Sequence, residues 1–148
     1  MRVENYLKLD PQRDKIVESE KYRRNAIGYY ENSESLIKQK EFAKAGEMLW
    51  GAIAEGVKAL NMIRTGEPVR DHAGIRRILK NIVLEYKKKG LNEQYSKAAD
   101  NLHVNFYETF LDESDFFKQY DYAKLLFGLL MDITQPMNRE SIQQTLKP

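Results

Sequence analysis

The sequence predicts an all-α protein, an antiparallel bundle of about five helices. Apolar residues recur every three or four positions and never alternate steadily with polar ones, which is the helical period. Turn signals separate segments that are long enough for helices. The 148 residues match the commonest size of one domain. We therefore expect a single domain over residues 1–135. A tail over residues 136–148 either forms one short helix or has no regular structure.

The first two helices are expected to precede and follow Lys40. Asp10 and Pro11 offer an N-cap and a proline at the first helical position, with residues 11–19 either continuous with the helix or a looser first piece. The second helix, near Phe42 to Ile63, has small and apolar residues on one narrow arc: Ala45, Leu49, Ala52, Gly56, Ala59 and Ile63. Such an arc lets a neighbouring backbone come close. Its wide apolar surface is typical of a central helix.

Three more helices are expected after the turn at residues 65–68. Asp71 can cap the third helix, and Gly90 supplies its stop after a cationic last turn. The fourth helix starts near Asn92 and carries an apolar stripe of Tyr95, Ala98, Ala99, Leu102, Phe106 and Phe110. The fifth runs from about Ser114 to Ile133.

Composition excludes several classes of protein. There is no cysteine, which removes disulfides, thiolate catalysis and Cys-based zinc sites. The two histidines, His72 and His103, form no H-E-x-x-H pair, so we predict no metal site, and no cofactor motif is present. The start lacks a signal peptide, and the most apolar stretch is too short to span a bilayer. We expect a cytoplasmic protein without a membrane partner. A net charge of +2 does not by itself indicate nucleic-acid binding.

Two phrases of the sequence carry a family resemblance. They are EMLWGAIAEGVKAL, residues 47–60, and LHVNFYE, residues 102–108. Over residues 25–133 the chain resembles the PaREP-type domain, a family of small helical proteins largely confined to archaea. That family is similar in fold to the HEPN superfamily of helical bundles, which often dimerise. The resemblance implies an HEPN-like homodimer in an archaeal cytoplasm. Some HEPN members are ribonucleases, and others bind nucleotides or partner nucleotidyltransferases.

The resemblance also directs attention to His103. HEPN ribonucleases place Arg-x(4–6)-His on one helix, and here Lys97 stands five intervening residues before His103. Lysine is a point charge and lacks the guanidinium fork that clamps a phosphate, so this departure argues against cleavage. Asp100 and Tyr107 lie one turn away on either side and could orient the imidazole for acid–base work. The candidate catalytic residues are therefore His103, Lys97 and Tyr107. The alternative is a histidine that only packs between helices.

The sequence of the third helix predicts a face rich in cationic side chains. Its cations oppose the single acid Glu85 and form the candidate nucleic-acid surface: Arg76, Arg77, Lys80, Lys87 and Lys88, with Lys89 beside them. A solvated face whose last-turn lysines answer the helix dipole is the alternative, because no aromatic residue for base stacking lies on this face. His72 is expected to complete the cap beside Asp71 and to react with nothing.

Two further features point to binding. Glu47, Glu55 and Lys58 share the polar side of the second helix with small residues between them, forming either a shallow pocket or an ordinary i, i+3 surface pair. The fifth helix is apolar over more of its circumference than one neighbour covers, so it is either the centre of the bundle or half of a two-fold interface. The predicted interface residues are Tyr122, Leu125, Leu126, Leu129 and Ile133.

Three function classes remain, in order of preference. The first is a non-catalytic dimeric binding or assembly module whose partner is an RNA or another protein. The second is a divergent metal-independent ribonuclease using Lys97 and His103. The third is a nucleotide-binding regulator that uses the polar side of the second helix, and a pocket there would favour it.

Overall fold

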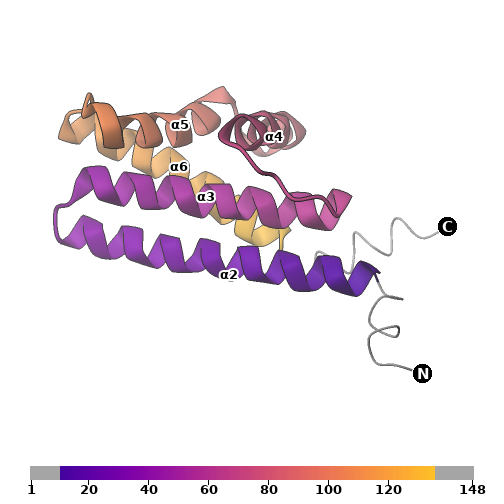
Figure 1. Ribbon diagram of the computed structural model, residues 1–148. Helices are drawn as coiled ribbons and strands as arrows, with labels where there is room; N and C mark the ends of the chain where they lie inside the picture. The colour runs from indigo at the N-terminus through magenta and orange to yellow at the C-terminus, as the bar shows by residue number, and fades with distance from the viewer. Residues whose placement is uncertain (1–10, 136–148) are drawn as a thin grey trace, which may run out of the picture.

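The computed structural model describes residues 11–135 and confirms the all-α prediction, with helices and no strand in that range (Figure 1). The helices are α2 (Pro11–Lys38), α3 (Phe42–Thr65), α4 (His72–Glu85), α5 (Glu93–Glu108) and α6 (Glu113–Ile133). A 3-10 turn, η1 (Lys87–Lys89), stands between α4 and α5. The cap predicted at Asp10 and the predicted tail lie outside the described residues.

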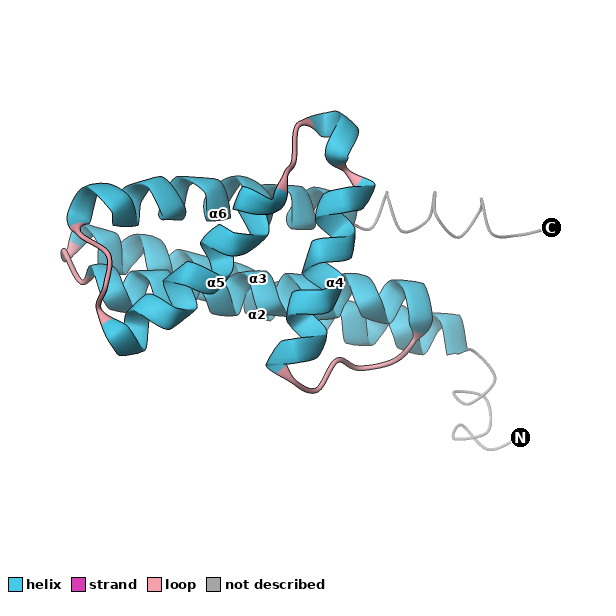
Figure 2. Cartoon of the chain, turned by 90° about the horizontal axis from the view of Figure 1, so that it is seen from above, coloured by secondary structure: helices cyan, strands magenta, loops and turns pink. Residues whose placement is uncertain are grey.

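The helices form two antiparallel hairpins bridged by α4. Helices α2 and α3 make one hairpin, and α5 and α6 make the other, while α4 crosses α3 and is seen almost end-on in Figure 1. Seen from above, α4 and α5 lie over α3 and α2, and α6 runs alongside them (Figure 2). Helix α3 contacts all four other helices, which confirms its prediction as the central one.

Small residues on α3 set how closely its neighbours pack. A Cβ at Gly46 would stand 3.1 Å from the Phe116 ring and 3.2 Å from Leu102. A Cβ at Gly56 would stand 3.3 Å from Leu130. All three distances are tighter than ordinary contact, so each glycine accepts a loss of helix propensity of about 1 kcal/mol in return for closer packing. The contact at Gly56 is the close approach of a neighbouring helix that the small-residue arc predicts.

Buried hydroxyls join α2 to the rest of the bundle. Ser33 Oγ donates to the Ala45 carbonyl at 2.6 Å and lies 2.8 Å from the Tyr120 hydroxyl. Ser19 Oγ donates to the Ala59 carbonyl at 3.0 Å. Burial raises the pKa of the Tyr120 phenol above its ordinary value, so this group stays neutral. These bonds satisfy polar atoms inside the core and fix α2 against α3 and α6.

Helix ends differ from the sequence prediction in two places. The first helix is continuous from Pro11, which is one of the two alternatives predicted for residues 11–19. The third ends at Glu85, and its expected cationic last turn is the separate η1 before Gly90, whose φ is +92°. The fourth ends at Glu108, because Thr109 takes a left-handed φ of +47° and the Asn105 side chain accepts from the Leu111 amide at 2.9 Å.

The early end of α5 changes the predicted stripe of the fourth helix. Phe110 lies beyond the helix and is 52% exposed, and Phe106 in the last turn is 37% exposed. Neither residue belongs to the core, contrary to the prediction. Of the predicted stripe, the residues of α5 that are buried are Ala98, Ala99 and Leu102.

Candidate functional site

The first candidate site is built where α5 packs on α3. His103 Nδ1 lies 2.9 Å and 3.1 Å from the two carboxylate oxygens of Glu47. The His103 ring is stacked on Trp50, with the ring centroids 5.0 Å apart. Because an ionised carboxylate only accepts, Nδ1 carries the proton of this bond, and Nε2 of a neutral ring holds the lone pair. His103 is thus a fixed, partly buried base with 15% of its side chain exposed.

Of the two residues predicted to orient His103, Tyr107 contacts it and Asp100 pairs with another residue. Asp100 instead pairs with Arg76 of α4, at 3.4 Å, and the carboxylate that holds the imidazole comes from α3. Tyr107 does contact His103, edge-on with centroids 5.6 Å apart, and is itself 69% exposed. Spacing along one helix finds residues one turn away, and it gives no information on a partner 56 positions earlier in the chain.

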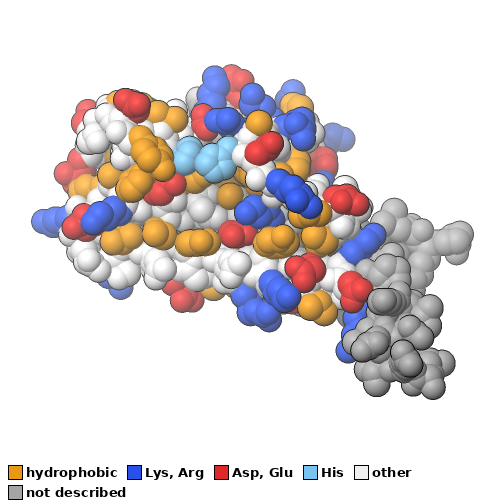
Figure 3. All heavy atoms as spheres, viewed as in Figure 1, with side chains coloured by type: hydrophobic (Ala, Val, Ile, Leu, Met, Phe, Trp, Pro, Cys, Tyr) orange, Lys and Arg blue, Asp and Glu red, His pale blue; other side chains and the backbone are white. Residues whose placement is uncertain are grey.

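His72 joins this site, which the sequence analysis missed. Its neighbour Asp71 caps α4 as predicted, accepting from the Gly74 amide at 2.7 Å. The His72 ring lies edge-on to the rings of His103 and Trp50, with centroids 4.9 Å and 5.8 Å apart. The two imidazoles lie together on the face drawn in Figure 3. No local signal could have found this pair, because it depends on where α4 crosses α3.

A hollow of about 280 Å³ opens beside these rings, over the polar side of α3. We call it the histidine hollow. It is lined by Tyr29, Glu47, Met48, Trp50, Gly51, Ala54, Glu55, Lys58 and His72. The sequence analysis left a pocket at Glu47, Glu55 and Lys58 open as one of two alternatives, and the structure has both the pocket and the i, i+3 pair. Lys58 Nζ lies 3.8 Å from Glu55 Oε2.

Glu55 is the most unusual group in the histidine hollow. Its Oε2 atom is buried and has no hydrogen-bond partner, since Lys58 is too distant to donate. Burial raises the pKa of Glu55 above its ordinary value, and the Lys58 ammonium offsets part of that rise. A buried carboxylate oxygen without a hydrogen bond is costly, and a cation close to the carboxylate lowers that cost.

Lys97 lies on another side of α5. Six positions along an α-helix amount to a rotation of about 120°, so Lys97 and His103 project in different directions. Lys97 is 66% exposed and pairs with Glu93 at 3.4 Å, whereas His103 faces α3. The structure therefore does not bring together the two residues that the ribonuclease alternative requires.

Three hollows, of about 450, 150 and 260 Å³, adjoin at Lys97 on the face made by α4, α5 and α6. We call them together the Lys97 groove. Among the side chains that line it, those with charged, amide or phenol groups are Arg76, Lys80, Lys87, Asn92, Glu93, Gln94, Lys97, Asp100, Asn101, Asp115, Lys118, Gln119 and Tyr122.

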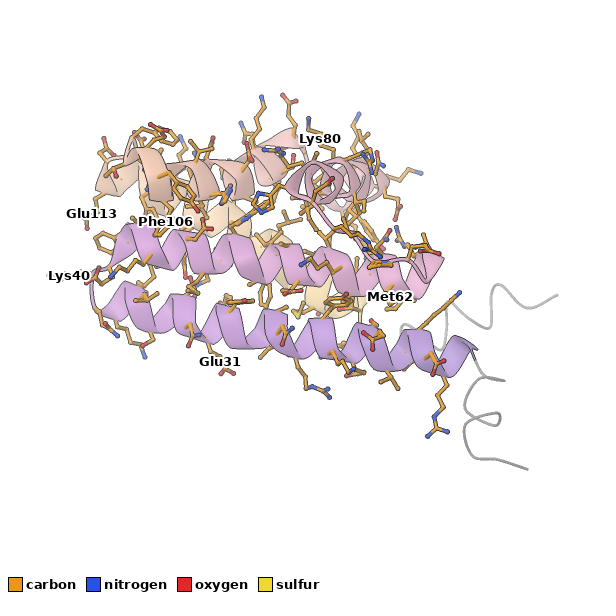
Figure 4. The ribbon with its side chains drawn as sticks, in the orientation of Figure 1. Glu31, Lys40, Met62, Lys80, Phe106 and Glu113 are labelled. Carbon is orange, nitrogen blue, oxygen red and sulfur yellow. The ribbon has the colours of Figure 1, made fainter. Side chains whose placement is uncertain are left out.

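The predicted cationic face divides between this groove and open solvent. Arg76, Lys80 and Lys87 line the groove, and Lys80 lies on the side of α4 away from α3 (Figure 4). Arg77 and Lys88 are exposed outside its lining. Glu85, the one acid expected to oppose these cations, accepts two bonds from Arg64 at 2.7 and 2.9 Å. That acid is therefore neutralised from α3.

The surface predicted for dimerisation on α6 is mixed. Leu125 is 62% exposed, whereas Leu126 is fully buried in the core and is not part of any exposed surface. Tyr122, Leu129 and Ile133 are half-buried. The 100° step between consecutive helical residues explains why neighbours differ so sharply: Leu126 faces α3 and Leu125 faces away.

In residues 11–135 no three carboxylate or imidazole side chains gather as a metal site, and no helix there has the length and apolarity needed to cross a bilayer. Fold and sites together define a small helical bundle with two hollowed faces. A family model matches residues 21–127, and the chain belongs to the archaeal PaREP1/PaREP8 family. Searches of curated proteins and of solved structures found no match, so the similarity to HEPN bundles stays a prediction.

Proposed function

We propose that this PaREP-family chain is a non-catalytic, homodimeric binding module that holds single-stranded RNA in the Lys97 groove. One observation carries the proposal: three hollows that meet at Lys97 are lined by cations and amides contributed by three helices. Cations that follow a phosphate backbone supply most of the affinity for a nucleic acid. Amide side chains add donors and acceptors for sugars and bases.

The charges of the groove favour an anionic chain. Its lining has five cations, Arg76, Lys80, Lys87, Lys97 and Lys118, against three carboxylates. Two of these carboxylates, Glu93 and Asp100, already pair with groove cations. Within residues 11–135, Lys80 and Lys87 have no ion pair, so they are available to phosphates.

The groove also contains the aromatic group that α4 by itself lacks. Tyr122 lines the end of the groove at α6, and its ring contacts Tyr95 edge-on with centroids 5.1 Å apart. Stacking of a base on an aromatic ring is the second recurring element of single-strand binding. The absence of aromatics was the argument against RNA on the third helix alone, and it does not apply to a groove shared with α6.

The absence of catalysis in this proposal rests on the separation of Lys97 from His103. A cation that stabilises a cleaved phosphate and a base that takes its proton have to reach the same phosphodiester. Here Lys97 opens to the groove, and Glu47 holds His103 against Trp50 on another side of α5.

The homodimer rests on α6. Leu125 is a large exposed apolar side chain, and Gly128, one turn on, has only open space where a Cβ would stand. A glycine inside an exposed helix costs about 1 kcal/mol with no gain in packing within the chain. An antiparallel copy of α6 placed over this strip would set each Leu125 on the Gly128 of the other copy, with Leu129 and Ile133 beside them.

Fluorescence anisotropy with a labelled, unstructured RNA of about 12 nucleotides tests the RNA proposal. We expect Lys80→Gln with Lys87→Gln to weaken binding at least about tenfold and to reduce the slope of log affinity against log salt by about 1.4. Tyr122→Ala should weaken it about five- to a hundredfold. The matched control is Lys21→Gln with Lys44→Gln, two exposed lysines outside the groove.

Equal losses in the groove variant and its control would contradict a defined groove, as would a wild-type protein that does not bind at low salt. The same mixtures in EDTA, run on a denaturing gel, should contain intact RNA. Cleavage that disappears in His103→Ala would establish the ribonuclease alternative instead.

The dimer is tested by light scattering on a sizing column. We expect twice the chain mass for the wild type and a folded monomer for Leu125→Glu, because the new charge disfavours the contact and leaves the core intact. Leu126→Glu, one position on, should unfold the chain, since it buries an unpaired charge. A wild type that runs as a monomer contradicts the proposal, and so does a Leu125→Glu variant that stays dimeric.

A further inference from the structure

We infer that the histidine hollow is a second, separate site, and that its ligand is an aliphatic polyamine. The hollow lies over α3, where α2 and α4 form its sides, and it shares no residue with the Lys97 groove. The inference is therefore independent of RNA binding.

The shape of the hollow suits an unbranched chain. Its floor is Gly51 and Ala54, which leave space over one face of α3. On one side the Tyr29 ring stands 3.7 Å from the place where a Cβ of Gly51 would be. On the other side His72 stands edge-on to Trp50. The hollow therefore lies between the aromatic side chains of Tyr29 on α2 and His72 on α4.

Its charges suit a ligand with more than one cationic nitrogen. Glu47 and Glu55 stand eight positions apart on one face of α3, which places their Cα atoms about 12 Å apart along the helix axis. The apolar floor lies between them. Two carboxylates separated by such a floor match a chain that carries an ammonium group near each end. Aromatic faces also attract alkylammonium groups.

Glu55 gives the strongest reason for a donor ligand. Its Oε2 atom is buried with no hydrogen-bond partner, and Lys58 Nζ stands 3.8 Å away. A ligand ammonium beside the Glu55 carboxylate would help to compensate this buried charge. At the other end, Glu47 is held by His103 through one ring nitrogen, and each of its oxygens has a further lone pair for a second donor.

An anionic ligand fits the hollow less well. A nucleotide phosphate would meet two carboxylates and a single lysine, Lys58, which already lies beside Glu55. Lys58 therefore separates the two ligand classes. Toward a polyamine it is a competing cation at Glu55, whereas toward a nucleotide it would be the main attraction.

Trp50 reports binding directly, because it is the only tryptophan of the chain and borders the hollow. The experiment titrates the full-length protein, free of nucleic acid, with spermidine and follows Trp50 fluorescence. Butylamine, adenosine monophosphate and sodium phosphate are the comparison probes. We expect a saturable change with spermidine, an affinity at least about tenfold weaker for butylamine, and no response to the two anions.

Variants test where spermidine binds and whether each charged side chain strengthens or weakens its binding. Glu55→Gln should weaken spermidine at least about tenfold, and Gly51→Leu should abolish the response by filling the floor. The control Glu18→Gln removes a surface carboxylate of α2 outside the hollow and should bind as the wild type does. Lys58→Gln should strengthen binding. Circular dichroism of each variant establishes that it is folded, and Glu55→Gln and Lys58→Gln keep the backbone and side-chain size nearly unchanged.

Three results would overturn the inference. One is no response to spermidine in the millimolar range. Another is a response that Glu55→Gln and Glu18→Gln reduce equally, which indicates general attraction of a cation to the surface. The last is binding of adenosine monophosphate that Lys58→Gln removes, which would assign the hollow to a nucleotide.

Discussion

Helix α5 has two sides that differ in almost every physical respect. His103 on one side is 15% exposed, bonded to Glu47 and stacked on Trp50. Lys97 on the other is 66% exposed and pairs with Glu93, four positions away on the same helix. The first set of residues is brought together by tertiary packing, and the second only by helical spacing. The comparison teaches that residues close in sequence, on one helix, can belong to unrelated surfaces.

The two sides also differ in what their charges contribute. Around His103 the polar atoms are partly removed from water, so each bond made or missing affects the stability of the fold. Around Lys97 the charges remain hydrated and contribute little to folding, which leaves them available to a ligand from solution. Predictions that separate stability from binding therefore test the comparison directly.

The largest expected effect is the loss of the ring beneath His103. Trp50 is 3% exposed, so Trp50→Ala should lower the free energy of unfolding by about 3–5 kcal/mol. Lys97→Ala, across the helix, should change it by less than about 0.5 kcal/mol. Urea unfolding followed by circular dichroism measures both. Similar losses for the two variants would contradict the contrast between a packed and a solvated side.

The next effect is the coupling between Glu47 and His103. A double-mutant cycle with Glu47→Ala and His103→Ala should give a coupling free energy of about 1 kcal/mol, because the bond is partly buried. The reference cycle uses Glu93→Ala and Lys97→Ala, whose side chains are 79% and 66% exposed. That pair should couple by about 0.3–0.5 kcal/mol. Equal couplings would mean that burial does not strengthen the interaction between Glu47 and His103.

A smaller effect concerns Glu55 and depends on pH. Since burial raises the pKa of Glu55 in the folded chain, the folded state binds this proton more tightly than the unfolded state does. The stabilisation is complete below the unfolded pKa, near 4.5, and is lost as the pH rises through the folded pKa. Above the folded pKa the ionised group therefore destabilises the fold.

Replacing that group should reverse the effect. Glu55→Gln should stabilise the chain at neutral pH by up to about 1 kcal/mol, and the gain should vanish as the solution is acidified below the unfolded pKa. Thermal melts across this pH range measure the difference, with Glu18→Gln as the exposed control. A gain that stays constant with pH would show that the carboxylate charge is not its cause.

The smallest expected effect is also the sharpest test of the geometry of α5. Lys97→Arg restores the Arg-x5-His spacing of HEPN ribonucleases. Because Glu47 and Trp50 hold His103 against α3 whereas residue 97 opens to the groove, we expect no cleavage of RNA in EDTA and a change in RNA affinity of less than about twofold. A denaturing gel measures the first quantity and anisotropy the second. Cleavage that requires His103 would show that the two sides act on one phosphate after all.

Much of the fold was predictable because its signals are local. The period of three to four and the cap at Asp71 each depend on a few consecutive residues. The central place of α3 was also predictable, since a wide apolar surface with small residues on one arc requires neighbours on several sides. Local signals failed at helix ends such as Thr109, where the chain turns so that the Asn105 side chain can accept a hydrogen bond from the Leu111 amide.

The sites were predictable only in part. Spacing along one helix found the pair of Glu55 and Lys58 and the cations of α4, because i, i+3 neighbours share a face. It assigned Asp100 to His103, although Asp100 pairs with Arg76, and it gave no sign that His72 reaches His103. Those contacts join helices whose crossing is set by packing.

By itself the sequence determined that this protein is an all-α bundle of the PaREP1/PaREP8 family, with few groups capable of chemistry. Tertiary structure alone decided which of those groups meet. It set His103 on Glu47 and beside His72, and it turned Lys97 toward the α4–α6 face. The physical reason is that hydrophobic periodicity fixes which side of each helix is buried, whereas the side chains that face one another across helices depend on how the small and large residues of the core interlock.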